Sequence, residues 1–525
     1  MNKRPTLSLK TSAKAPAKAP AKAVAKAPAR GPARESARGP AQTPAQAPSQ
    51  APARTAAPVR APAQERAPRP AQERPAALRA SHAREFKPAL QTSFQTSLKG
   101  DSLAYSLLGA AQAVALVRTG TNLPQALAQL WARSETSPQA RGAMQDIAYR
   151  CMRQLGQSEA LIAQLAPKAP DALVAALLAC ALALMTAPDA VAPYEEFTVV
   201  NQTVTAAEAH PDTARAKAMV NAVLRRFQRE RAALLETALL QPVAQWNYPQ
   251  WWIDAARTAW PRDWQAILQA GNGAPPLTLR INARKTSMEQ YLQRLQQAGM
   301  AASAIGPYAV RLEKPVGVHL IPGFAEGVVS VQDAGAQLAA PLLDVQDGMR
   351  VLDACAAPGG KTCHILELAD AQVTALDADP KRLARVGENL ERLQLQATLR
   401  TADAQSAAWW DGQQFDRILA DVPCTASGIV RRHPDIRWLR RKGDTLQLAT
   451  LSAKILDNLW QMLAPGGKLL FVTCSLWPQE SEAQAAAFAV RHQAVRLDAP
   501  GQLLPGGVAG QDQDGLFYAL FQKNA

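Results

Sequence analysis

Two cysteines carry the clearest chemical signal in this 525-residue chain. Cys424 lies in the Asp-Val-Pro-Cys-Thr segment at residues 421–425, and Cys474 in the Val-Thr-Cys-Ser segment at residues 472–475. A thiolate can act as a covalent nucleophile, while a second thiol can handle a proton. Carbon 5 of a pyrimidine is a poor nucleophile until a thiolate adds to carbon 6 and pushes electron density across the ring. The pair therefore indicates chemistry that prepares C5 of a cytosine for methylation.

The part of the chain that holds both cysteines, residues 345–525, alternates short apolar runs with helical patterns. The runs lie at residues 349–353, 373–376, 418–420, 469–472, 495–497 and 516–521. Most are continuous, as in strands that helices cover on both faces. Helical patterns occupy residues 362–369 and 446–463 between them. We predict a doubly wound α/β domain whose ligand lies at the carboxyl ends of its strands.

A glycine turn follows the first of these strands, and it consists of Cys355, Ala356, Ala357, Pro358, Gly359, Gly360 and Lys361. Glycine lets the backbone approach a ligand closely, although the spacing here is neither that of a dinucleotide fingerprint nor that of a Walker loop. Asp377, Asp403 and Asp421 stand at or near the ends of the following strands. Such acids suit S-adenosylmethionine, because its hydroxyl and amino groups donate hydrogen bonds and its sulfonium is cationic. We expect no metal, because the six cysteines contain no Cys-x-x-Cys pair.

Three regions precede this domain. Residues 1–95 form a Lys-, Ala- and Pro-rich tail that we expect to be disordered, because it cannot bury enough apolar surface. Residues 100–240 show helical periodicity almost throughout and predict an all-α bundle, with residues 172–187 as a central helix. Residues 241–344 predict a small α+β module with a strand at 277–282, and its tryptophans fit core positions better than base-stacking ones.

The distribution of charge indicates where nucleic acid could bind. The first 90 residues hold 18 Lys or Arg and four Glu, which accounts for 14 of the net charge of +15, and the remainder holds 40 basic and 39 acidic residues. The tail is therefore either a phosphate-binding arm or a solubilising linker. Four arginines near residue 228 could meet RNA, or they could be solvated and complement a helix C-terminus, and we favour the second interpretation: Arg225, Arg226, Arg229 and Arg231.

The segments at 355–361, 377–383, 421–428, 431–435 and 472–475 together resemble the motifs of the RNA cytosine-C5 methyltransferases. The helical segment at 220–227 resembles the antiterminator-like RNA-binding domain of the Sun (Fmu) branch, which modifies small-subunit ribosomal RNA in bacteria. The likeness covers residues 102–523, although residues 194–207 match the family only loosely. It implies a class I methyltransferase domain that follows an RNA-binding bundle and an RNA-binding-like α+β module.

The resemblance also implies roles for single residues. Cys474 is then the nucleophile, and Cys424 helps to release the product, with Asp421 and Pro423 in the same catalytic segment. The glycine turn with Asp377, Asp403 and Asp421 holds S-adenosylmethionine. We expect Lys361 to promote ionisation of Cys474. Because residues 431–433, Arg-Arg-His, lie between the catalytic segments, we expect them to contact RNA phosphate.

The implied activity is methyl transfer from S-adenosylmethionine to C5 of a cytosine in 16S ribosomal RNA. Three alternatives stay open: another RNA, either transfer or large-subunit ribosomal RNA; a noncatalytic ribosome-assembly factor; and a DNA cytosine methyltransferase with Cys424 as nucleophile. The second cysteine and the helical domain argue against the last. We expect a cytoplasmic monomer that binds no DNA and enters no membrane, because residues 172–187 are too short for a bilayer span.

Overall fold

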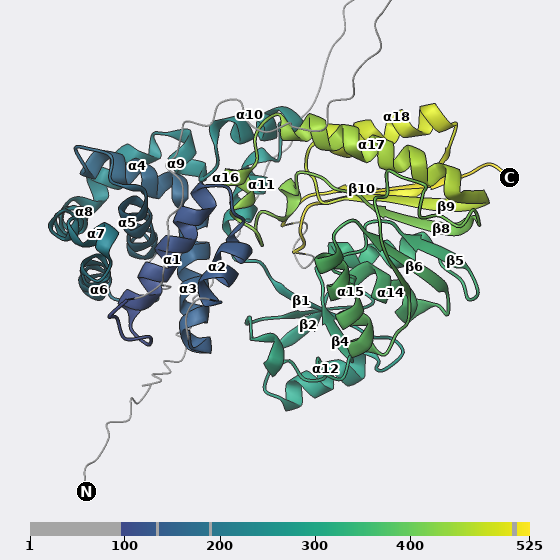
Figure 1. Cartoon of the computed structure of the whole chain (residues 1–525), viewed down its shortest axis with the longest axis horizontal. Coiled ribbons are helices and arrows are strands. Elements are labelled where there is room, and N and C mark those ends of the chain that lie inside the picture. Colours follow the sequence, from purple (N-terminus) through teal and green to yellow (C-terminus); the bar gives the residue numbers. More distant parts are fainter. Residues whose placement is uncertain (1–95, 133–135, 188–191, 507–511) are drawn as a thin grey trace, which may run out of the picture. The chain divides into compact units, whose positions relative to one another are not determined.

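The computed structural model describes residues 96–132, 136–187, 192–506 and 512–525. The prediction of a disordered tail at residues 1–95 lies outside these ranges. Within them, a helical region is followed by a small antiparallel sheet and then by a large mixed sheet with helices on both faces (Figure 1). This order confirms the predicted fold class.

The helical region consists of α1 (Leu103–Arg118), α2 (Leu123–Trp131), α3 (Pro138–Arg153), α4 (Leu155–Leu165), α5 (Ala172–Met185), α6 (Glu196–Glu208), α7 (Pro211–Ala214) and α8 (Lys217–Leu239). Side chains of Ser102, Asn122 and Ser137 accept hydrogen bonds at the starts of α1, α2 and α3. Helix α5 is buried on nearly all sides, as its uninterrupted Ala and Leu content predicts. The expected central helix is therefore confirmed.

Three helices join this bundle to the rest of the chain: α9 (Pro242–Trp246), α10 (Gln250–Ala259) and α11 (Trp264–Asn272). They carry the tryptophan-rich stretch, in which Trp252 is fully buried. Its ring packs edge-on against Trp477, only three residues beyond Cys474. The tryptophans therefore form core, as predicted, and part of that core supports the segment that follows one of the two key cysteines.

The small sheet has the order β2-β3-β1-β4, and all of its pairings are antiparallel. Its strands are β1 (Leu277–Ile281), β2 (Ala302–Ala304), β3 (Ala309–Leu312) and β4 (Val329–Val331), and helix α12 (Met288–Gln297) packs on it. A capping box of Ser287 and Gln290 begins α12. A short 3-10 turn, η2 (Val318–Leu320), precedes β4, and η3 (Gly335–Leu338) follows it.

The large sheet has the order β10-β11-β9-β8-β5-β6-β7. Its strands are β5 (Arg350–Asp353), β6 (Gln372–Asp377), β7 (Thr398–Thr401), β8 (Phe415–Asp421), β9 (Leu463–Thr473), β10 (Val495–Leu503) and β11 (Leu516–Gln522). The pairs among β5 to β9 are parallel, whereas β11 runs antiparallel to β9 and β10. The strand order reverses between β5 and β8, which is where a doubly wound sheet opens a crevice for its ligand.

Helices cover both faces of this sheet (Figure 1). One layer holds α17 (Asp444–Met462) and α18 (Glu482–His492), and the other holds α13 (Ala339–Leu343), α14 (Gly360–Leu368) and α15 (Pro380–Leu393). The 3-10 turns η4 (Ser427–Ile429) and η5 (Pro478–Glu480) and the short helix α16 (Ile436–Leu439) lie beyond the ends of β8 and β9. The two apolar cores fix the strand ends at which chemistry was predicted.

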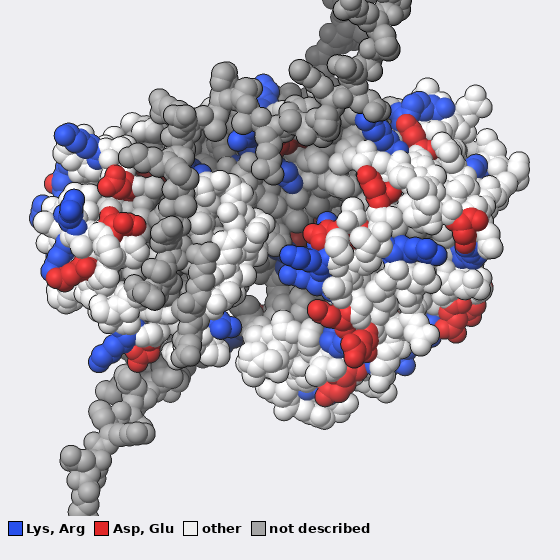
Figure 2. Space-filling model, viewed as in Figure 1, with Lys and Arg blue, Asp and Glu red and all other residues white. Residues whose placement is uncertain are grey.

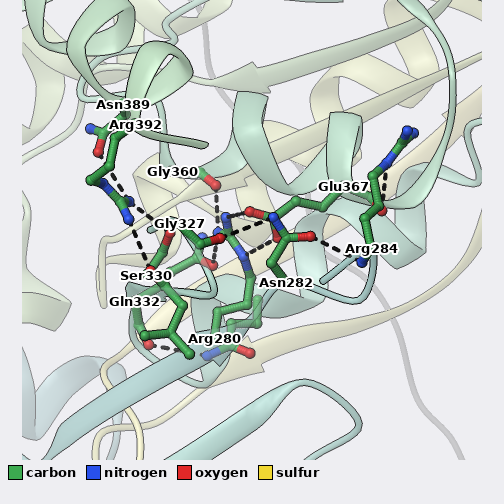
Figure 3. Close-up of polar contacts among 12 residues, drawn as sticks. Arg280, Asn282, Arg284, Gly327, Ser330, Gln332, Gly360, Glu367, Asn389 and Arg392 are labelled. Atoms are coloured by element: carbon green, nitrogen blue, oxygen red, sulfur yellow. Dashed lines mark hydrogen bonds and ion pairs between the residues drawn. The ribbon is translucent and has the colours of Figure 1, made fainter. Parts of the chain in front are cut away.

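A fully buried ion pair ties the small sheet to the large domain (Figure 3). Arg280 on β1 donates two hydrogen bonds to Glu367 on α14, of 2.8 and 2.7 Å, and both side chains are at most 1% exposed. The same guanidinium donates to the carbonyl of Gly360 at 2.7 Å and to Gln332 Oε1 at 2.5 Å. Because Gly360 belongs to the glycine turn, this contact links the small sheet to the proposed ligand loop.

Basic and acidic side chains are interspersed on the face shown in Figure 2, with wide uncharged areas between them. This agrees with the near balance of charge that the sequence gives beyond residue 90. Among the described residues, no helix combines the length and the apolar character that crossing a bilayer requires.

Replacing Arg280 with Ala should destabilise the protein by about 3 to 5 kcal/mol, because the buried Glu367 would lose its ion-pair partner and would have to stay charged in a buried site or take up a proton. Urea unfolding followed by tryptophan fluorescence measures the effect. Lys217→Gln is the control, since Lys217 pairs with Glu208 on the surface and its loss should cost less than about 1 kcal/mol. Equal effects of the two substitutions would contradict the structural role of the Arg280 pair.

Candidate active site

The two cysteines meet because β8 and β9 are parallel neighbours. Asp421 at the end of β8 pairs with Val472 of β9, and the amide of Val422 donates to the Val472 carbonyl at 3.2 Å. The segments that follow β8 and β9 then leave the sheet at the same edge. The Sγ atoms of Cys424 and Cys474 lie 3.5 Å apart, at hydrogen-bonding distance. The parallel pairing thus brings together residues that are 50 positions apart in sequence.

The environments of the two thiols differ. Cys424 is buried, whereas Cys474 is partly exposed. The hydrogen bond with Cys474 raises the pKa of Cys424 well above its usual value, and burial and the negative charges of Cys474 and Glu480 raise it further. Because two thiolates at this distance repel each other, the pair carries one negative charge at most at neutral pH. Of the two, Cys424 is the sulfur whose environment holds it in the thiol form.

A cation stands beside this pair, as predicted for Lys361. Its Nζ donates to Asp421 Oδ2 at 2.6 Å, and the Lys361 side chain is only 15% exposed. Burial alone would lower the pKa of Lys361, but the charge and hydrogen bond of Asp421, together with the charge of Cys474, raise it overall. Lys361 therefore stays protonated and places a positive charge near the two thiols.

The glycine turn lies between β5 and α14. Gly359 adopts a φ of 98°, which favours glycine, and begins α14; a Cβ there would lie 3.0 Å from Val386. Asp377 at the end of β6 is 4% exposed and accepts from the amides of Ala357 and Asp379, at 3.2 and 3.0 Å. The structure thus joins Asp377 to the turn and Asp421 to Lys361. Pro423, two residues after Asp421, is exposed.

Asp403 lies two residues beyond β7, at the same edge of the sheet. It is exposed, and its carboxylate accepts from the backbone amide of Gln405 at 2.9 Å and from the Gln405 side chain. The hydrogen bonds of Asp403 therefore stay within its own loop. Unlike Asp377, it makes no hydrogen bond to the glycine turn among the contacts of the described residues.

Asp353, the last residue of β5, is a fully buried acid below the turn. It accepts a 2.6 Å hydrogen bond from Thr362 Oγ1. Burial raises the pKa of Asp353 to about 7, the hydrogen bond from Thr362 opposes this rise, and the nearby charge of Asp421 adds to it. Asp353 is consequently an internal support of the loop, partly protonated near neutral pH.

A buried carboxylate that the sequence interpretation missed connects the two cysteine segments. Glu480 in η5 is 1% exposed and accepts hydrogen bonds from Thr425 and Ser475, the residues that directly follow Cys424 and Cys474. Arg440 was missed as well; it donates to the carbonyls of Thr425 and Cys424 at 3.0 and 3.3 Å. The only sequence signal was an acid six residues after Cys474, in the polar run Gln-Glu-Ser-Glu at residues 479–482.

The predicted phosphate contact of residues 431–433 is contradicted. Arg431 pairs with Asp512, and Arg432 pairs with both Asp333 and Asp514. Burial lowers the pKa of His433, against the charge of Asp435, so its ring is neutral at pH 7. The two arginine side chains thus bind other parts of this chain, including the carbonyls of Ala274 and Pro276.

The helix-end interpretation of the four arginines after Leu224 is also wrong, because α8 continues to Leu239 and has no basic residue in its last turn. Two of them form ion pairs instead. Arg226 pairs with Glu230 along the helix, and Arg231 pairs with Glu196 on α6. Arg225 stacks over the Phe197 ring at 5.2 Å.

A doubly wound sheet with its last strand antiparallel, a glycine turn after β5 and acids at neighbouring strand ends define a Rossmann-like methyltransferase. A family model described as 16S rRNA methyltransferase RsmB/F matches residues 340–522. A second, described as an RsmF/B-like ferredoxin-like domain, matches residues 248–319, and the NusB family matches residues 108–229.

Named relatives agree with these matches. Ribosomal RNA small subunit methyltransferase B of Pseudomonas syringae pv. tomato is 43% identical over 430 residues, which cover 78% of this chain and 91% of the relative. The Salmonella typhi protein of the same name is 48% identical over 318 residues, covering 58% and 73%. This chain therefore belongs to the ribosomal RNA small subunit methyltransferase B family, as the resemblance predicted. The crystal structure of PH0851 shares the fold, with a TM-score of 0.63 and 22% identity over 81% of this chain and 99% of that one.

Asp353→Asn should remove a pH dependence of stability. Because the folded-state pKa of Asp353 is raised to about 7, its contribution to stability is fully present below about pH 4 and is lost as the pH rises through 7. Between pH 4 and pH 8, the wild type should therefore lose on the order of 2–4 kcal/mol of unfolding free energy that the variant does not lose. Urea unfolding at both pH values measures this, and parallel pH curves for the two proteins would refute it.

Proposed function

We propose that this protein transfers a methyl group from S-adenosylmethionine to C5 of a cytosine in 16S ribosomal RNA, with Cys474 as the nucleophile. The observation that carries the proposal is the 3.5 Å contact between Cys424 and Cys474 beside the Lys361–Asp421 ion pair. Family membership and the names of the relatives support the RNA class. The target base must be unstacked, because a thiolate approaches C6 perpendicular to the ring.

Cys474 is the better nucleophile of the two. It is partly exposed, it lies close enough to Lys361 for its charge to raise the pKa of the lysine, and its neighbour Cys424 holds the proton. A DNA-type mechanism would require Cys424 to ionise first, in the more buried position. The environment of Cys424 opposes that order.

Because the two thiols are coupled, Cys424 can act as a base after Cys474 has reacted. Once the Sγ of Cys474 is bonded to C6, its negative charge is gone, and so is the largest influence that raises the pKa of Cys424. Cys424 then releases its own proton to water, and the resulting thiolate, or a water that it orients, removes the proton from C5. The electrons of the C5–H bond re-form the double bond, and the Cys474 thiolate leaves.

We assign the methyl donor to the residues of the glycine turn, from Cys355 through Ala356, Ala357, Pro358, Gly359 and Gly360 to Lys361, with Asp377, Asp403 and Asp421. When bound, S-adenosylmethionine supplies an electrophilic methyl group on a sulfonium. The fit rests on two features: Gly359 permits a left-handed turn, and buried Asp377 keeps that turn beside the end of β6. Carboxylates at this edge accept from hydroxyl and amino groups and favour a cation.

Cys424→Ala should accumulate a covalent complex with 16S rRNA, because attack proceeds while release is slowed, whereas Cys474→Ala should form none. Incubation with transcribed 16S rRNA and S-adenosylmethionine, followed by denaturing gel electrophoresis, separates the two outcomes. An adduct lost in Cys424→Ala and kept in Cys474→Ala would reverse the roles. Absence of both adduct and methyl transfer in the wild type, despite binding of S-adenosylmethionine, would favour a noncatalytic assembly factor.

A further inference from the structure

We propose that Glu480 is a positioning residue that holds the Cys424 and Cys474 segments together, so that the two thiols stay at their working separation. The inference rests on the proposed roles of the cysteines. Glu480 lies in η5 and has no place in the chemistry assigned to Cys474, Cys424 or the glycine turn.

The contacts of Glu480 divide between the two segments. Its Oε1 accepts from the backbone amide of Thr425 at 2.8 Å. Its Oε2 accepts from the hydroxyls of Thr425 and Ser475, each at 2.6 Å. Thr425 follows Cys424 directly, and Ser475 follows Cys474 directly. One carboxylate therefore accepts hydrogen bonds from the neighbours of both thiols. All three donors are buried, and water cannot replace the carboxylate without a change in the segments.

A second layer of contacts makes the arrangement cooperative. Ser427 accepts from the amide of Leu476 at 2.8 Å and lies 3.2 Å from the hydroxyl of Ser475. The amide of Gly428 donates to the carbonyl of Cys474 at 2.8 Å. Each of these bonds crosses between the β8 and β9 segments. Loss of Glu480 would therefore also weaken these other bonds, because they depend on the alignment of the two segments that its carboxylate fixes.

The charge of Glu480 acts on the thiols as well. Besides Glu480, the titratable and charged groups around the pair include Lys361, Asp421 and Tyr518, and Arg440 faces Glu480 itself. Burial raises the pKa of Glu480, but hydrogen bonds from Ser475 and Thr425 favour the carboxylate. A negative charge there discourages ionisation of Cys424. Glu480 thus affects the ionisation of Cys424 in addition to the spacing of the two segments.

Glu480→Gln tests the role in the full-length protein, with Glu482→Gln as matched control. Glu482 lies two residues away, is 54% exposed and pairs with Arg496 on the surface. With transcribed 16S rRNA and tritiated S-adenosylmethionine, we expect kcat of Glu480→Gln to fall by about 10- to 100-fold. Its Kd for S-adenosylmethionine, measured by calorimetry, should stay within about twofold, because the carboxylate does not touch the glycine turn. The control should match the wild type.

The pH profile separates positioning from a general loss of structure. Removing a negative charge beside Cys424 should move the pH limb for Cys424 ionisation, read from the rate at which the covalent adduct decays, to lower pH. A damaged fold would lower the rate without moving that limb. Wild-type kcat in Glu480→Gln, or a reduced kcat with an unmoved limb, would overturn the proposal.

Ser475→Ala provides a second test should Glu480→Gln not fold. It removes one of the three contacts and keeps the carboxylate, so kcat should fall about threefold to tenfold while the pH limb stays in place. Wild-type kcat in Ser475→Ala would then overturn the proposal. Failure of the proposed function is distinguishable, because it requires that the wild type form no adduct through Cys474.

Discussion

Two thiols 3.5 Å apart cannot both carry a negative charge in a largely buried site, and most of the candidate active site follows from this constraint. The proposed mechanism needs one ionised and one protonated sulfur before the base binds. It separates their environments by burial, by the Lys361 ammonium and by the Glu480 carboxylate. The parallel pairing of β8 with β9 brings the sulfurs together, and the polar groups around them decide which one ionises first.

The sheet can hold these strand ends because its two apolar cores are filled from both sides. Leu469 and Phe471 on β9 pack into one core, and Leu470 and Val472 pack into the other. The alternation of these side chains fixes the face on which each residue lies, since a slip by one residue would exchange the cores. Apolar packing thus sets the register that places Cys474 next to Cys424.

The meeting of the two cysteines and the neighbouring acids at one edge of the sheet could be predicted from the sequence, whereas the contacts that hold the strand ends in place could not. Short apolar runs ending in Asp377 or Asp421 reveal a shared sheet edge, because parallel strands present their carboxyl ends together. Arg280 and Glu367, in contrast, are 87 residues apart, and neither stands in a recognisable pattern. Arg431 and Arg432 look like phosphate ligands in sequence, since nothing local shows that Asp512 and Asp514 will neutralise them. Ion pairs between residues far apart in the chain produce no periodic pattern in the sequence.

The segment after Cys424 shows why such contacts concentrate near the site. Asp435 accepts from the amide of Leu123 at the start of α2, and Trp438 donates to the carbonyl of Met152 at the end of α3. Arg437, fully buried, stacks over Tyr248 at 3.8 Å and donates to the carbonyls of Asn247 and Gly271. The chain that leaves the Cys424 segment is therefore anchored in the helical bundle and in the tryptophan-rich helices. A buried arginine needs such carbonyls to offset the loss of water, so these partners fix its position closely. Any shift of the bundle that moved α2 or α3 would act on this segment through defined hydrogen bonds, which gives the helical region a physical connection to the thiol pair.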